Sequence, residues 1–297
     1  MANDQLSQVG AEVLLLPTDA KARFSEFGLE VLLAPTSADA RFSEIGFEVL
    51  YREDDFVPSS YSAGILELSP WLYWRLGDTS GTVADDASSN GRDGTYSGSP
   101  TLAQSGVLNG EYDDGAVYFD ATNDRLISPG IFNFGAATVV VFFDYDGTLP
   151  GSTGFIAGCA EGEGSNSSDK VLQLTTAGKV AWTTFDGGGH TVTDTNDLGT
   201  GWHMLVGRVG YGVADLWVDG VRVGYTASGP SYTGYVAPNV AVGGKNDYTG
   251  PTRVAGKRDE FAIFDKVLTD KQIVGLWLAS MFSPSSGGKS FDILQLG

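Results

Sequence analysis

The chain has 297 residues, with 37 Asp and Glu against 18 Lys and Arg, so its formal net charge is −19 at pH 7. Such an acidic surface repels nucleic-acid backbones and anionic membranes, and no apolar run reaches the ~20 residues of a membrane span. The sequence therefore predicts no nucleic-acid partner and no membrane insertion, and its single Cys159 excludes an intramolecular disulfide framework.

Residues 1–51 contain three copies of an 18-residue repeat. Gly10, Gly28 and Gly46 each precede a Glu-Val-Leu motif at the same distance. Apolar and polar residues alternate in every copy, which indicates three amphipathic β-strands. The apolar residues that we expect to contact a partner are Val13, Phe27, Val31, Leu33, Phe47 and Val49.

Three short strands cannot bury their apolar faces by themselves. Two arrangements stay open, namely a small meander packed on the following domain or an arm that anchors the chain to another protein. Identical motifs in one chain match identical sites on a symmetric partner, so we expect an anchoring arm and a place in a symmetric homo- or hetero-oligomer. The first ten residues lack the basic start and apolar core of a signal peptide, so secretion by that route is not expected.

Residues 52–69 are rich in charge, Pro and Ser, and predict a linker with a short extended piece at Ile65–Leu68. The domain that follows should fold without the arm. Its first segment, Trp71–Leu76, has large residues on both faces, as in a strand covered on both sides. A loop rich in Asp, Ser, Asn and Gly comes next.

Further strands are predicted where apolar and β-branched residues alternate or run together, and the Asp-Gly pair at 219–220 marks a tight hairpin. Thr269 and Gln272 fit a capping box at the start of a short helix. Cys159 lies among apolar residues and is expected to be a buried strand thiol. The predicted strands are Gly115–Phe119, Thr138–Phe143, Val171–Thr175, Val180–Phe185, Trp202–Val209, Ala214–Val218, Val221–Tyr225, Val240–Gly243 and Lys257–Phe264.

Three sequence stretches carry a family resemblance: YWRLGD at 73–78, DDASSNGRDGTY at 85–96, and DEFAIFDKVLTDKQI at 259–273. They resemble the opening and closing segments of laminin-G-like domains among the concanavalin A-like lectins and glucanases. The resemblance implies an all-β fold, a two-sheet antiparallel jelly roll over residues 70–282, preceded by the arm of three β-strand repeats. Residues 283–297 would form a tail that is either frayed or a second docking peptide.

The same resemblance implies a calcium site that joins the early loop to the acid before the closing strand. It nominates Asp86, Asn90 and Asp259 as ligands, with Asp85 as a substitute. Hard oxygen ligands of this kind suit Ca²⁺. The alternative is a turn-rich loop whose Asp and Asn side chains bond their own backbone.

Catalytic signals are missing. Retaining glycosidases need two carboxylates ~5–5.5 Å apart, and the Glu-x-Asp-x-x-Glu pattern of the glucanase branch does not occur. Asp259 and Glu260 are adjacent and should point to opposite faces of a strand, and no nucleophile motif accompanies His190 or His203. We therefore expect a protein that is not an enzyme, although a glycoside hydrolase stays a third alternative.

Loops at one end of a jelly roll often bind sugars through aromatic side chains that stack on the sugar rings, although surface Tyr residues commonly have no ligand at all. The aromatic candidates lie in Gly-rich segments and are Tyr211, Tyr232, Tyr235 and Tyr248. Repeat arms ahead of such a domain resemble accessory virion proteins of tailed bacteriophages. We therefore expect a structural or adhesion protein of a virion, bound to other virion proteins through its repeats; the alternative is a secreted or cell-surface carbohydrate-binding module.

Overall fold

The computed structural model describes residues 41–43, 46–48, 56, 58–108, 111, 114–132, 135–160, 170–185, 189–227, 237–244 and 253–281. Side chains are described in these ranges except at 41–48, 129–132, 160, 237 and 238. The described residues fall into two compact units, one containing 41–48 and the other containing 56–281.

In the first unit, strand β1 (Arg41–Ser43) pairs antiparallel with β2 (Gly46–Glu48), and Phe42 lies opposite Phe47. The third repeat therefore forms a hairpin within itself, whereas the sequence predicts one strand running through Ile45. Of the predicted contact residues, Phe47 lies in β2; Val13, Phe27, Val31, Leu33 and Val49 lie outside the described residues.

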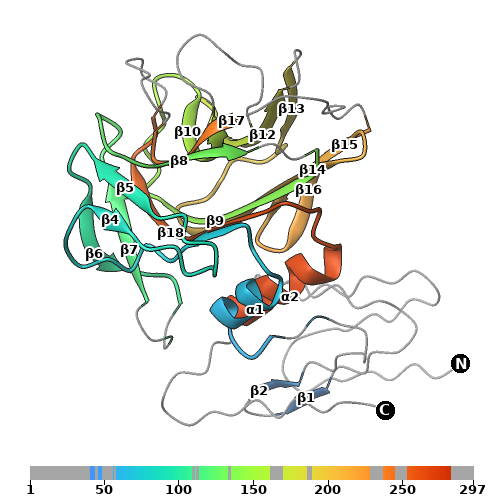
Figure 1. The fold of residues 1–297 in the computed structure, drawn as a ribbon. Coiled ribbons are helices and arrows are strands. Elements are labelled where there is room, and N and C mark those ends of the chain that lie inside the picture. The colour runs from blue at the N-terminus through green and yellow to red at the C-terminus, as the bar shows by residue number, and fades with distance from the viewer. Residues whose placement is uncertain are drawn as a thin grey trace, which may run out of the picture. The chain divides into compact units, whose positions relative to one another are not determined.

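The second unit is a sandwich of two antiparallel sheets with two helices on one side (Figure 1). The predicted two-sheet antiparallel architecture is thus confirmed for this unit. In order across it, the first sheet contains β13 (Gly189–Thr193), β12 (Val180–Phe185), β11 (Lys170–Leu174), β10 (Gly154–Ala160), β17 (Ala237–Val242), β8 (Arg125–Phe132), β5 (Gly94–Ser97) and β4 (Val83–Ala84).

The second sheet is organised around its long closing strand. Strand β18 pairs with β9 along one edge, and on its other edge with β7 and then with β3. In order, this sheet contains β16 (Val221–Thr226), β15 (Val213–Val218), β14 (Gly201–Gly210), β9 (Ala137–Tyr145), β18 (Gly256–Phe264), β7 (Gly115–Phe119) and β6 (Thr101–Ser105), with β3 (Leu72–Trp74) beside β18.

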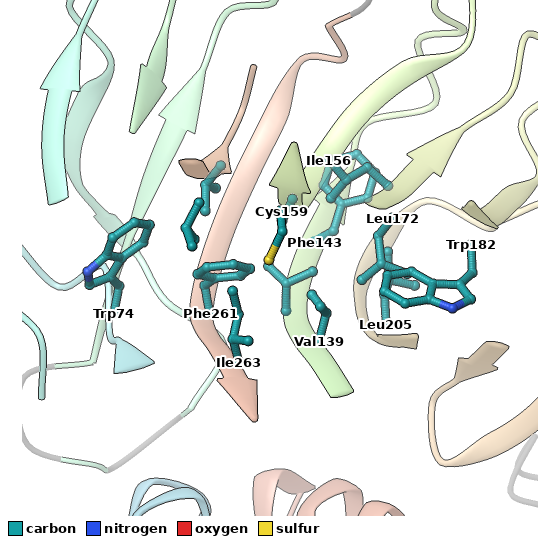
Figure 2. Close-up of a cluster of buried hydrophobic side chains, with 14 of the residues drawn as sticks. Trp74, Val139, Phe143, Ile156, Cys159, Leu172, Trp182, Leu205, Phe261 and Ile263 are labelled. Carbon is teal, nitrogen blue, oxygen red and sulfur yellow. The ribbon is translucent and has the colours of Figure 1, made fainter. Parts of the chain in front are cut away.

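The main core lies between the sheets, and Figure 2 shows apolar side chains from both of them meeting there. Trp74, Phe143 and Phe261 come from the second sheet, and Trp182 comes from the first. Cys159 lies among them, fully buried in β10, as its apolar neighbours predict. Burial of this much apolar surface is the main stabilising term of such a sandwich.

A second core covers the outer face of the second sheet. Strand β9 alternates between the two cores, with Val139 and Val141 in the main core and Val140 and Phe142 in the second. The strand is therefore buried on both faces, as its continuous apolar run predicts. Helices α1 (Tyr61–Glu67) and α2 (Asp270–Met281) supply the cover.

Helix α2 begins as predicted. The Thr269 backbone N–H donates to Gln272 Oε1 at 2.8 Å, and the Gln272 backbone N–H donates to Thr269 Oγ1 at 3.2 Å. These two hydrogen bonds are the reciprocal pair of a capping box. Among the described residues, neither α2, with 12 residues, nor the shorter α1 is long and apolar enough to cross a membrane.

Helix α1 replaces the extended piece that the sequence predicts at Ile65–Leu68. Ser60 caps it, accepting a hydrogen bond from the Ala63 N–H at 3.2 Å, and Tyr61 and Ile65 are fully buried on one face. A Cβ at Gly64 would lie 2.7 Å from Pro58 and 3.1 Å from Leu276, so only glycine lets the two helices approach. The sequence does not predict this helix because it has only seven residues and contains Gly64, and glycine is a poor helix former.

We expect α1 to stabilise the second unit. Ile65→Ala should destabilise the full chain by about 2–5 kcal/mol, since it removes a fully buried side chain. Leu66→Ala is the matched control, because Leu66 is 46% exposed. Chemical denaturation measures the loss of stability in both variants; equal losses would contradict the packing described here.

A fragment of residues 56–281, which contains α1, should melt at a higher temperature than one of residues 70–281, which lacks it.

Candidate metal centre and binding groove

A β-bulge in β18 places two acidic side chains on one side of the strand. The pairing of β18 with β9 shifts register between Asp259 and Ala262, and Glu260 has a left-handed φ of 52°. The prediction that Asp259 and Glu260 point to opposite faces is therefore wrong, because it assumed a regular pleat. Both side chains are fully buried.

Asp114, just before β7, completes a group of three carboxylates. One oxygen from each of Asp114, Asp259 and Glu260 lies within 4.8 Å of the other two. An acidic group of this kind could hold a metal ion. The sequence nominated only Asp259 from this group; the available signal for Asp114 was an acid directly ahead of a strand that pairs with β18.

Glu260 is held by two residues of the YWRLGD stretch. The Tyr73 hydroxyl donates to Glu260 Oε2, and Arg75 Nε donates to Glu260 Oε1 at 3.0 Å. Arg75 Nη2 also lies 3.3 Å from Glu111 Oε2. Burial raises the pKa of Glu260 to about 7, although the charge of Arg75 opposes this shift.

Asp259 is less well satisfied. Its Oδ2 accepts a hydrogen bond from the Val107 N–H at 2.9 Å, but its buried Oδ1 has no hydrogen-bond partner among the described residues. Burial, followed by the charge of Glu260, raises the pKa of Asp259 well above its ordinary value. The buried Tyr61 hydroxyl also has no described hydrogen-bond partner, and burial raises its pKa, with smaller contributions from Glu260 and Asp259.

The early loop uses its predicted metal ligands to hold itself together. Both oxygens of Asp86 accept hydrogen bonds, Oδ1 from the Tyr73 and Ser88 backbone N–H groups and Oδ2 from the Arg92 N–H and the Ser88 hydroxyl, at 2.7–3.0 Å. The alternative interpretation, in which such side chains bond nearby backbone, describes Asp86 better than metal ligation does. Filled acceptors leave this carboxylate a poor fit to Ca²⁺.

Asn90 also has a bonding role in this loop. Its Nδ2 donates to the carbonyls of Pro70 and Trp71 and to the Ser88 hydroxyl at 3.1–3.2 Å. Asp85 is exposed. The structure therefore separates the predicted ligands: Asp86 and Asn90 belong to the loop network, whereas Asp259 belongs to the buried group with Asp114 and Glu260.

A groove of about 640 Å³ runs beside this loop. Three separate segments line it: the end of α1 and the start of β3, the early loop, and the turn after β18. Trp71 is half-buried in it, with the Arg92 guanidinium 4.1 Å from the ring centroid. The side chains that line the groove include Trp71, Ser88, Ser89, Asn90, Asp265 and Lys266.

The aromatic glycan candidates lie elsewhere. Tyr211 is 91% exposed in the turn between β14 and β15 and does not line the groove. Tyr232, Tyr235 and Tyr248 lie outside the described residues.

His203 has an acceptor at each ring nitrogen. Nδ1 lies 2.7 Å from Asp219 Oδ2, and Nε2 lies 3.0 Å from the Gly199 carbonyl oxygen. Only the doubly protonated ring can donate to both. Burial lowers the pKa of His203, but the hydrogen bond and charge of Asp219 raise it by more, so the net pKa lies above its ordinary value.

The described geometry agrees with comparisons to known proteins. A family profile described as the concanavalin A-like lectin/glucanases superfamily matches residues 113–274. No curated protein sequence matches the chain.

Solved structures share the fold at low sequence identity. Domain 4 of AbnA, an extracellular arabinanase of Geobacillus stearothermophilus in complex with arabinotriose, has a TM-score of 0.53 and 17% identity over 70% of this chain and 98% of its own. The botulinum neurotoxin serotype D binding domain has a TM-score of 0.56 and 13% identity, over 73% of this chain and 53% of its own. This chain thus spans about half of the neurotoxin binding domain, and the likeness concerns the fold alone.

The environment of His203 predicts a pH-dependent contribution to stability. Because its folded-state pKa lies above the unfolded value of ~6.5, the contribution is complete below that pH and is lost as the pH rises through the folded pKa. The stability difference between the native protein and His203→Gln should therefore be larger at pH 6 than at pH 9. Urea denaturation measures it, with His190→Gln as the control; a difference that is constant across this range would contradict the assignment.

Proposed function

Because the chain belongs to the concanavalin A-like lectin/glucanases superfamily, we propose that it is a non-enzymatic, glycan-binding structural protein of a virion. In this proposal the second unit binds the glycan, and the N-terminal repeats attach the protein to other virion proteins. The ligand class is supported by two solved relatives: the arabinanase domain in complex with arabinotriose, and a botulinum neurotoxin DC binding domain described in complex with SialylT.

The groove beside Trp71 is the main observation that supports the proposal of glycan binding. It combines an aromatic ring with hydroxyl, amide and charged groups, which is the mixture that sugar sites use for apolar contact and for orientation. Asn90 and Arg92 both donate hydrogen bonds to the Trp71 carbonyl at 3.1 Å, so the chain around the ring is already held in place.

The absence of catalysis is supported by burial. Asp259 and Glu260 are neighbouring carboxylates, yet both are fully buried, so a substrate cannot reach them. Both ring nitrogens of His203 lie against acceptors of the protein itself, Asp219 Oδ2 and the Gly199 carbonyl oxygen, so neither is oriented toward a substrate as a general base would be.

Attachment through the arm is supported by the three in-register repeats and by their resemblance to phage accessory proteins. Each repeat binding one copy of a symmetric partner would combine weak contacts into firm attachment. The rival function is a secreted or cell-surface carbohydrate-binding module, which the arabinanase domain favours because it belongs to an extracellular enzyme.

Glycan binding can be measured with the full chain. We expect binding on a glycan microarray that includes arabino-oligosaccharides and sialylated oligosaccharides, followed by calorimetry with the best probe. Ser89→Trp should weaken binding by roughly tenfold or more, since a large ring would fill the groove. Ser80→Trp is the matched control at an exposed position outside the groove. Loss of binding in Tyr211→Ala instead would move the site to that turn, and no binding by the native chain would refute the function.

Attachment can be measured in assembled particles. Val13→Asp, Val31→Asp and Val49→Asp should each reduce incorporation, and the triple variant should abolish it, because each change places a charge on an apolar strand face. Thr18→Asp with Thr36→Asp controls for added charge between the strands. Quantitative mass spectrometry of purified particles gives the copy number; native incorporation of the triple variant would rule out the anchoring role.

A further inference from the structure

We propose that a row of side chains on the outer face of the second sheet is an additional binding surface for a neutral oligosaccharide, separate from the groove beside Trp71. The row crosses the neighbouring strands β14, β9, β18, β7 and β6, and is called the sheet strip below (Figure 1). Its members, in this order, are Trp202, Asp144, Lys257, Tyr118 and Thr101. The inference rests on the proposed function, because it requires a chain that binds glycans, but it does not require the groove.

Strand pairing places the side chains of the sheet strip beside one another. Trp202 lies opposite Asp144, which in turn lies opposite Lys257. Lys257 also lies opposite Tyr118 on its other side. Residues directly opposite each other in antiparallel strands share a face, with Cβ atoms about 5 Å apart. Since Phe143, the residue before Asp144, points into the main core, the sheet strip faces away from that core.

The helices that cover the outer face of this sheet leave the sheet strip partly open. On β9, Phe142 is fully buried against Tyr61 of α1, with the ring centroids 5.2 Å apart. Two residues farther along the same strand, the Asp144 side chain keeps 22% of its surface exposed. Trp202 and Tyr118 are half-buried. The sheet strip therefore presents two aromatic rings at the surface, beyond the cover of α1.

The chemistry of the sheet strip suits a sugar. Lys257 Nζ lies 2.8 Å from Asp144 Oδ2 and 5.5 Å from the centroid of the Trp202 ring, so the ion pair is held beside that ring. Among the described residues Asp144 Oδ1 has no hydrogen-bond partner, and an ammonium group has three donors. Aromatic rings can stack on the apolar faces of sugars, while the ion pair can bond their hydroxyl groups. The two opposite charges cancel, which favours a neutral sugar over an acidic one.

The separation of the two rings indicates an oligosaccharide as the ligand. Trp202 and Tyr118 stand three strand intervals apart, which corresponds to roughly 14 Å at ~4.8 Å per interval. One sugar ring cannot contact both aromatic rings, whereas a linear chain that lies across the strands can. Affinity at the sheet strip should therefore increase with the length of the oligosaccharide.

The sheet strip and the groove lie near opposite ends of β18. Lys257 is the second residue of this strand, whereas Asp265 of the groove follows its last residue, Phe264. The distance along the extended chain between Lys257 and Asp265 is roughly 26 Å at ~3.3 Å per residue. Two separate surfaces on one domain would combine weak contacts with a repetitive glycan into firmer attachment.

The test is calorimetry of the full chain with the disaccharide and the hexasaccharide of linear arabino-, xylo- and cello-oligosaccharides. We expect the hexasaccharide of at least one series to bind roughly tenfold or more tightly than its disaccharide. Trp202→Ala and Tyr118→Ala should each weaken hexasaccharide binding by roughly tenfold, since each removes a stacking ring. Tyr225→Ala is the matched control, because Tyr225 is an exposed aromatic residue on β16 of the same sheet, outside the sheet strip. Trp202 also packs against the second core, so Tyr118→Ala decides the result if Trp202→Ala fails to fold.

The outcomes separate the sheet strip from the groove. Hexasaccharide binding that survives Ser89→Trp and is lost in Tyr118→Ala would support the sheet strip. Native affinity in Tyr118→Ala, together with loss of binding in Ser89→Trp, would overturn the sheet strip and leave the groove in place. Binding of sialylated but not of neutral oligosaccharides would likewise overturn the sheet strip alone. Absence of binding to any glycan would refute the proposed function and this inference together.

Discussion

The ion pair between the partly exposed Arg75 and the fully buried Glu260 is the constraint on which much of this unit depends. Removing Arg75 would leave the buried Glu260 carboxyl without this cation, which is costly. The pair forms only because the bulge in β18 turns Glu260 toward β3, where Tyr73 donates to the same carboxylate. Strand β3 is short, with three paired residues, so these side-chain contacts add to its few backbone hydrogen bonds in fixing its register on β18.

The elements that the sequence predicts correctly are those whose structure is decided by local patterns. The Asp-Gly pair between β15 and β16, the capping box of α2 and the apolar run of β9 each act within a few residues. The outcome was different for α1, whose seven residues are helical because Tyr61 and Ile65 pack into a core made by distant strands. The bulge in β18 could not be predicted either, since a left-handed φ at Glu260 leaves no mark in the alternation of apolar and polar residues.

The candidate site shows the same division at the level of function. Asp86 and Asn90 stand in a segment rich in oxygen ligands, and composition alone cannot tell a metal loop from one that bonds its own backbone. The hydrogen bonds of the folded loop decide between them. Asp114 and Glu260 join Asp259 only through strand pairing, and Glu111 lies beside them through its contact with Arg75. Spacing along the chain therefore could not nominate Glu111, Asp114 or Glu260.

The groove beside Trp71 also gains its character from the fold. Its walls come from segments far apart in sequence, and hydrogen bonds tie them together: the Trp71 N–H donates to the Ile263 carbonyl at 2.7 Å, and Asn90 donates to the Pro70 carbonyl at 3.1 Å. A ligand entering a site held in this way orders few side chains, and affinity rises when that cost is small. The net charge of −19 slows the approach of an anionic sugar, but at physiological salt charges beyond ~8 Å are largely screened. Within the groove Lys266 and Asp265 offer one charge of each sign, so the charge of the whole protein does not by itself exclude a sialylated ligand.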